Sequence, residues 1–255
     1  MDLLANKYQR SSFYICDSLS NHIVGPLTKL IAENNKGYLL DCYLRADRIC
    51  TDEKRTEQWK QGGLFRARLG MESASQRILD DMVKKTTPDN MSKSLKALSK
   101  HGILTTTLWI VGYSGETDQE FNSTISFIEE NRDYIFQSDP WVFQYHPVGL
   151  SGSKELKKKG DKFRYSDEMD ILALSPYELD DNIGPAEKFD RLVKFTTKMD
   201  ELNIPNPYTL PEMYSAIKRF SDLHKDSGWD PLKSMRKIDT DPQKEESFEP
   251  LTVGH

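Results

Sequence analysis

The sequence predicts an α/β fold, either an open or closed (β/α) barrel or a doubly wound sheet. Five short runs rich in β-branched and aromatic residues occupy the first part of the chain. Helical patterns separate these runs, and connections of that length join parallel strands. Apolar and polar residues alternate within the strands, which favours a barrel with a polar interior over a sheet buried on both faces. The predicted strands are residues 12–17, 39–45, 64–71, 103–113 and 141–148.

The predicted helices carry start signals that have a physical cause. Ser73 with Gln76 and Thr117 with Glu120 have the spacing of a capping box, in which side chains satisfy the free N–H groups of a first turn. Pro88 stands at a first helical position, where its missing N–H costs nothing. The predicted helices are residues 21–35, 51–61, 73–82, 87–101 and 117–131.

The alternation is clearest in residues 64–71, where Ala67 and Leu69 alternate with Arg66 and Arg68. One face of the sheet therefore takes the helices, and the other carries polar side chains that line a barrel interior. We expect residues 1–150 to form this barrel from five βα units. Residues 151–225 are predicted to form a helical extension with helices at about residues 184–202 and 210–224, and the polar residues 226–255 a mobile tail.

Composition excludes several classes of protein. The 255 residues include 35 Lys and Arg against 40 Asp and Glu, a net charge of −5, so no broad basic surface exists for nucleic acid or anionic membrane. No apolar run reaches the length of a membrane span, and no signal peptide is evident. The odd set Cys16, Cys42 and Cys50 argues against a disulfide scaffold and for a reducing cytoplasm.

Candidate site residues follow from topology, because ligands of parallel α/β folds bind at the carboxyl ends of the strands. Those ends carry acids, bases, hydroxyls and glycines. Each also has a structural interpretation: an aspartate can cap a turn, and an arginine and a glutamate can form a buried pair. The strand-end candidates are Asp17, Arg45, Glu72, Ser73, Gly112, Glu116 and His146, and the candidates facing the interior are Tyr43, Arg66 and Gln144.

Residues 64–117 contain a long ordered set of motifs. The set is Gly70, Glu72, Ser73, Gln76, Leu79, Asp80, Met82, Lys84, Gly102, Ile103, Gly112, Gly115, Glu116 and Thr117. In this order they resemble the second half of a radical S-adenosylmethionine (SAM) core. Residues 12–45 resemble the preceding strands of the subgroup that often carries a cobalamin-binding domain, and the whole resemblance covers roughly residues 12–150.

The resemblance implies a partial (β/α) barrel that lacks its first strand, since the family has six strands. It implies that Glu72 holds the amino or ribose end of SAM and that Lys84 faces its carboxylate. Gly112 would lie against the adenine and Arg45 would face the SAM, with Ser73 and Glu116 completing the set. Asp17, Tyr43, Arg66, Gln144 and His146 are then the expected substrate contacts.

The family holds a [4Fe–4S] cluster on a C-x3-C-x2-C loop, which this sequence does not contain. Its three cysteines are too far apart in sequence to replace that loop, so we expect no metal ligands in this chain. Either missing sequence or a second polypeptide supplies the cluster, or the chain is a cluster-less relative. Cobalamin use would depend on a domain upstream.

Three functions stay open. The leading one is the C-terminal part of a radical SAM core, inactive alone, which cleaves SAM reductively and acts on a small molecule or peptide once completed. The second is a module that binds SAM or a partner without catalysis. The third is a barrel hydrolase that uses Asp17 and Glu72 as acid and base.

Overall fold

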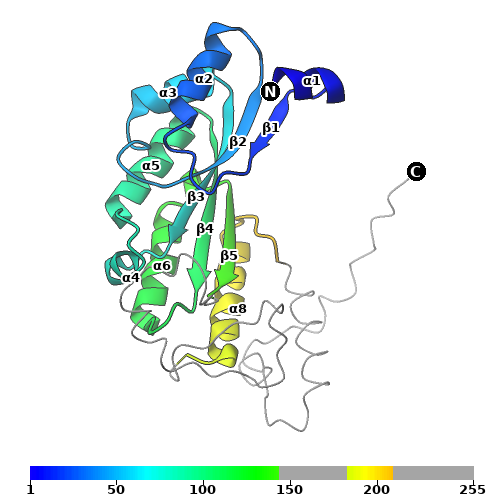
Figure 1. Ribbon diagram of the computed structural model, residues 1–255. Coiled ribbons are helices and arrows are strands. Elements are labelled where there is room, and N and C mark those ends of the chain that lie inside the picture. The colour runs from blue at the N-terminus through cyan, green and yellow to red at the C-terminus, as the bar shows by residue number, and fades with distance from the viewer. Residues whose placement is uncertain (144–182, 209–255) are drawn as a thin grey trace, which may run out of the picture. The chain divides into compact units, whose positions relative to one another are not determined.

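The computed structural model describes residues 1–143 and 183–208, and its centre is one five-stranded parallel sheet (Figure 1). The strands follow chain order in space, and each pairs in parallel with the next. This order confirms the predicted α/β class. The strands are β1 (Ser12–Ile15), β2 (Leu39–Leu44), β3 (Leu64–Glu72), β4 (Leu104–Val111) and β5 (Gln137–Val142).

The helices between successive strands lie on one side of the sheet (Figure 1). They connect neighbouring parallel strands, as a βαβ unit requires. A short helix precedes the first strand, and a long one packs against β5 and β4. The helices are α1 (Asp2–Tyr8), α2 (Val24–Glu33), α3 (Glu53–Gln61), α4 (Gln76–Asp81), α5 (Pro88–Lys100), α6 (Asp118–Glu130), the 3-10 turn η1 (Arg132–Tyr134) and α8 (Pro185–Glu201).

Alternate residues of the central strands build the core beneath these helices. Trp109 of β4 packs edge-on against Phe127 of α6, with ring centroids 5.9 Å apart. From α8, Phe195 and Met199 join the same cluster. The remaining buried residues of β2 and β3 in it are Leu40, Cys42, Leu44, Leu64, Ala67, Leu69 and Met71. The predicted strand phase is therefore confirmed.

The opposite face of the sheet, which we call the inner face, carries the alternate set of side chains. Its members come from all five strands and are mostly polar. They are Tyr14, Asp41, Tyr43, Arg66, Arg68, Thr106, Leu108, Ile110, Gln137, Asp139 and Trp141.

The last strand differs from the prediction of residues 141–148. Pairing with β4 runs from Thr106 opposite Gln137 to Val111 opposite Val142. The predicted start was wrong, because Asp139 and Pro140 are typical turn residues and the sequence pattern placed the start after them. Residues 144–148 of the predicted strand lie outside the described residues. Pro140 is tolerated because β5 is an edge strand that, among the described strands, pairs only with β4. On its other side, the Ser138 N–H donates to the Pro205 carbonyl at 2.9 Å.

The cap of α4 also differs from the prediction. The helix begins at Gln76, and Ser75 rather than Ser73 is its N-cap, accepting a hydrogen bond from the Ile78 N–H. Ser73 is buried, and its hydroxyl accepts from the Ser75 N–H at 3.1 Å. The Thr117–Glu120 capping box of α6 is confirmed.

The expected extension is described in part. Residues 185–201 form α8, inside the predicted helix of about residues 184–202. The second predicted helix, about residues 210–224, and the tail of residues 226–255 lie outside the described residues. In residues 1–143 and 183–208, none of the helices combines the length and the hydrophobicity needed to cross a membrane.

Gly112, just after β4, is the point where α8 comes closest to the sheet. Its φ is 75°, and a Cβ there would lie 2.6 Å from Cγ of Lys188. Gly37 has a similar φ of 63°, but a Cβ there would meet nothing within 4 Å. The two glycines therefore share a backbone conformation and differ in packing.

Replacing Gly112 by alanine should lower the free energy of unfolding more than replacing Gly37. In both variants the free energy of unfolding falls by about 1–2 kcal/mol, because alanine must adopt a left-handed backbone conformation. Gly112→Ala adds the displacement of α8, roughly 1–3 kcal/mol for overpacking. Urea unfolding of the two variants measures the difference. Equal losses would show that α8 does not depend on this contact.

Candidate functional site

Glu72 and Lys84 form an ion pair at the carboxyl end of β3. The Lys84 ammonium donates to Glu72 Oε1 at 2.6 Å, and both side chains are largely buried. Three residues between the end of β3 and Lys85 have positive φ: 65° at Glu72, 56° at Val83 and 53° at Lys85. Val83 ends α4, because its N–H donates to the Asp80 carbonyl and the Lys84 N–H donates to the Leu79 carbonyl.

A cavity of about 350 Å³ adjoins this pair. Glu72 stands at its edge, and the side chains of Leu108 and Ile110 line it from β4. Trp141 and Phe143 line it from β5 and the residue that follows. The cavity is therefore apolar with a charged edge, as expected for a ligand with a flat ring and a charged end.

The other strand-end candidates are placed differently. Arg45 fixes the loop through its backbone, whose N–H donates to Asn21 Oδ1 at 2.7 Å. Within the described residues, the Arg45 guanidinium has no hydrogen-bond or ion-pair partner. Asp17 is exposed beyond β1. Since β2 lies between β1 and β3, and Glu72 is paired with Lys84, no contact joins Asp17 to Glu72.

Glu116 is buried and holds α8 through an ion pair with Arg191. Its Oε2 accepts from the Gly112 N–H at 3.0 Å and from Arg191 Nη1 at 2.9 Å, with 2 % and 3 % of the two side chains exposed. Burial raises the pKa of Glu116, although the Gly112 and Arg191 bonds oppose this. Gly112 is likewise in contact with Lys188. Both residues thus have a structural role in this chain.

Aromatic and charged side chains meet on the inner face at β1, β2 and β3. Tyr14 donates a hydrogen bond to the Tyr43 hydroxyl at 2.6 Å. The pKa of Tyr14 is raised to about 12, mainly by partial burial and secondly by this hydrogen bond. Arg68 binds Asp41 through two hydrogen bonds of 2.8 Å. The Arg68 guanidinium also lies 5.0 Å from the Tyr14 ring centroid and 5.9 Å from that of Tyr43.

Arg66 lies next to this cluster but has neutral partners. Its Nε donates to Thr106 Oγ1 at 2.8 Å, and its Nη2 donates to Gln137 Oε1. On the same face, Asp139 Oδ1 is buried without a hydrogen-bond partner. Burial raises the pKa of Asp139, and the charges of Arg66 and Arg68 oppose that shift.

The structure therefore brings Tyr43 and Arg66 together on one face, as the sequence predicts. Gln144 and His146 lie outside the described residues. Sequence reasoning did not select Asp41, Arg68, Gln137, Asp139 or Trp141. The alternation in residues 64–71 already placed Arg68 on the inner face. Gln137 and Asp139 were missed because the predicted strand began at residue 141.

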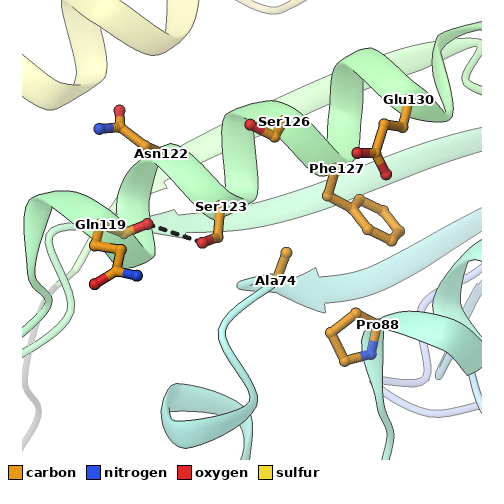
Figure 2. A pocket seen from close by; sticks show the side chains of 8 residues that line it. All are labelled: Ala74, Pro88, Gln119, Asn122, Ser123, Ser126, Phe127 and Glu130. Atoms are coloured by element: carbon orange, nitrogen blue, oxygen red, sulfur yellow. Dashed lines mark hydrogen bonds between the residues drawn. The ribbon is translucent and has the colours of Figure 1, made fainter.

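A larger cavity, about 690 Å³, lies on the helix-covered side (Figure 2). One α6 face provides most of its lining, and Ser123 there donates to the Gln119 carbonyl at 2.8 Å, a bond within the helix. Ala74 and Pro88 complete the opposite wall. The cavity holds one ionisable side chain, Glu130, and offers no evident chemistry.

The cysteines do not form a metal site in the described part of the chain. Cys42 and Cys50 are buried in the core, and burial raises the pKa of each thiol to about 12. Metals bind the thiolate form, which these surroundings disfavour. Cys16 is exposed on another strand end, and no group of three metal-ligating side chains occurs in residues 1–143 and 183–208.

The charged pair and the apolar cavity lie at the carboxyl ends of the parallel strands, which is where α/β folds of this kind generally bind ligands. Residues 23–128 match the model of the Radical SAM superfamily. This matched stretch includes the motifs between Gly70 and Thr117, so this part of the chain is similar to the superfamily.

Two known proteins are similar to parts of the chain. Over 163 residues it is 27% identical to the anaerobic magnesium-protoporphyrin IX monomethyl ester cyclase of Rubrivivax gelatinosus, covering 64% of this chain and 28% of that protein. Over 79 residues it is 34% identical to an uncharacterized methyltransferase of Pyrococcus horikoshii, covering 31% of this chain and 17% of that protein. The chain thus spans less than a third of these relatives.

Solved structures share the fold at low sequence identity. The radical SAM methyltransferase TsrM of Kitasatospora setae, with tryptophan and a SAM analogue bound, has a TM-score of 0.55 at 16% identity, covering 69% of this chain and 35% of that one. The cobalamin-dependent radical SAM enzyme OxsB has a TM-score of 0.55 at 12% identity, covering 87% and 40%. The described sheet therefore shares its fold with part of these two structures.

Glu120 fixes the segment after Glu72 against α6. Its carboxylate accepts from Arg77 at 2.6 and 2.7 Å and from the Ser75 hydroxyl at 2.9 Å. Arg77 is the main cause that lowers the pKa of Glu120 from 4.5 to about 2, with help from the Thr117 and Ser75 bonds. The stabilisation is complete above pH 4.5 and is lost as pH falls towards about 2.

Glu120→Gln should therefore flatten the acid dependence of stability. The difference in unfolding free energy between wild type and variant is expected to shrink as pH falls from about 4.5 towards about 2, where Glu120 becomes protonated. Urea titrations at several pH values measure it, and exposed Glu57→Gln is the control. A difference that does not change with pH would contradict this role.

Proposed function

We propose that this chain is part of a radical SAM enzyme core and binds SAM at the Glu72–Lys84 pair. The observation that carries the proposal is this pair, held 2.6 Å apart beside an apolar cavity at the strand ends. The methionine end of SAM is a zwitterion. Glu72 would accept from its ammonium, and Lys84 would donate to its carboxylate.

The rest of the SAM site follows from the same arrangement. The ring would enter the cavity lined by Leu108, Ile110 and Trp141. Arg45, with a free guanidinium within the described residues, would add a second cation on the neighbouring strand. Ser73, Gly112 and Glu116 would support the site through backbone and packing, because their polar atoms already have partners.

A [4Fe–4S] cluster would supply the electron for SAM cleavage in this family, but the described cysteines do not fit it. We propose that another segment supplies the cluster ligands, either sequence of a longer protein or a second polypeptide. β1 supports this, because in the described residues it pairs with β2 alone and leaves one edge free. Cobalamin and a small-molecule or peptide substrate in the barrel interior remain parts of the proposal.

The alternative is a cluster-less module that binds SAM or a partner without catalysis. The free state of the thiols, none of which forms a disulfide with another described cysteine, fits the proposed cytoplasmic location for either function. SAM affinity without a cluster is common to both, whereas turnover after adding a cluster-bearing segment distinguishes the enzyme core.

Glu72→Gln and Lys84→Met should each weaken SAM binding by roughly ten- to a hundredfold, the value of a hydrogen bond to a charged group. Equilibrium dialysis with labelled SAM measures the affinity. The exposed pair Glu53 and Lys100, also 2.6 Å apart, provides Glu53→Gln and Lys100→Met as matched controls with unchanged affinity. Equal effects in both pairs would contradict the site.

Anaerobic reconstitution of the isolated chain with iron and sulfide should yield no stoichiometric cluster, because two of its three thiols are buried. Iron and sulfide analysis with an absorption spectrum checks this. A variant with all three cysteines replaced by serine gives the adventitious background. One cluster per chain above that background would overturn the proposal that another segment supplies the ligands.

A further inference from the structure

The two arginines of β3 lie on the inner face, and hydrogen bonds hold both guanidiniums in place. Arg66 and Arg68 are two residues apart on one strand, so their Cα atoms lie roughly 7 Å apart on the same face. Each guanidinium is fixed through Nε and Nη2, by Thr106 and Gln137 in one case and by Asp41 in the other.

Aromatic rings restrict both guanidiniums further. Arg66 lies 5.5 Å from the centroid of the Phe136 ring, and Arg68 lies near the rings of Tyr14 and Tyr43. With an aromatic ring beside it and two nitrogens bonded, each guanidinium has little freedom left. A fixed donor loses little conformational entropy when it binds a ligand.

The third nitrogen of each group stays available. Within the described residues, Nη1 of Arg66 and Nη1 of Arg68 make no hydrogen bond, and neither atom is among the buried unpartnered ones. Arg68 is neutralised by Asp41, whereas Arg66 has no ion-pair partner in the described part of the chain. Burial raises the pKa of the nearby Asp139, and the charges of Arg66 and Arg68 oppose that shift.

We infer that Arg66 and Arg68 form a subsite for the carboxylate of the substrate, which is therefore a carboxylic acid. This inference rests on the proposed function, since it concerns the substrate of the same barrel interior. The two Nη1 groups would donate to the carboxylate oxygens, Arg66 would supply the uncompensated charge, and Thr106 would act as a positioning residue through Arg66 Nε.

Benzoate and benzamide test this subsite, because they share a shape and differ in charge. Side-chain ¹⁵N NMR of the arginine groups, titrated with each compound, should show binding of benzoate and none of benzamide. Arg66→Gln should weaken benzoate binding at least tenfold, and Arg66→Lys, which keeps the charge without the planar group, should weaken it less. Thr106→Val should also weaken it and broaden the Arg66 signal.

Control variants separate this subsite from the SAM site. Lys84→Met should leave benzoate binding unchanged while it weakens SAM binding, and Arg66→Gln should do the reverse. Exposed Arg55→Gln on α3 should change neither. Benzoate binding that is lost in Lys84→Met and kept in Arg66→Gln would overturn the subsite. Tighter binding of phenyl phosphate than of benzoate, or equal binding of benzamide, would also overturn it.

Discussion

Because side chains alternate along a strand, burying one set of β2 and β3 residues beneath the helices forces the other set onto the inner face. Leu40, Cys42 and Leu44 are buried, so Asp41 and Tyr43 must lie opposite. The same rule places Arg66 and Arg68 beside them. Partly buried charged groups need partners, and the bidentate Arg68–Asp41 pair and the bonds of Arg66 provide them.

At the carboxyl end of β3, the backbone conformation determines where Glu72 and Lys84 lie. The chain leaves β3 through Glu72 in a left-handed conformation and returns through two more such residues to bring Lys84 back. A Cβ on residue 70 would lie 2.8 Å from Glu72 Oε1, so Gly70 makes room for the carboxylate. The left-handed Val83 ends α4, so the end of this helix returns the chain to Glu72.

The α8 helix packs against β5 and β4 and forms a buried ion pair with the segment after β4. Arg191 reaches across to Glu116, and both side chains are almost fully buried. A buried pair of this kind is strongly destabilising to break, by about 3–5 kcal/mol, because the remaining charge has no compensation. Gly112 and Glu116, which are part of the motif set between Gly70 and Thr117, thus contact α8 in this chain.

Local patterns allowed most of the fold to be predicted. The alternation in residues 64–71 fixed the faces of β3, and the Thr117–Glu120 box fixed the start of α6, because both depend on neighbours in sequence. The start of β5 was missed because Asp139 and Pro140 resemble a turn until pairing with β4 is known.

Contacts between distant segments were not accessible from sequence. Two serines, Ser73 and Ser75, are equivalent as caps by composition, and tertiary contacts with Thr124 and Glu120 decide between them. The partnership of Arg68 with Asp41 depends on strand register, and that of Glu116 with Arg191 spans 75 residues. Glu72 and Lys84 were selected from a motif, and their 2.6 Å contact gives that selection a physical basis.

Hydrogen–deuterium exchange with and without saturating SAM tests the central claim most directly. If SAM lies between Glu72, Lys84 and the adjoining cavity, exchange should slow in peptides that cover residues 70–85 and 108–112 and stay unchanged in α2 and α3. Protection confined to the outer face of α6, or none in residues 70–85 under saturation, would contradict the account.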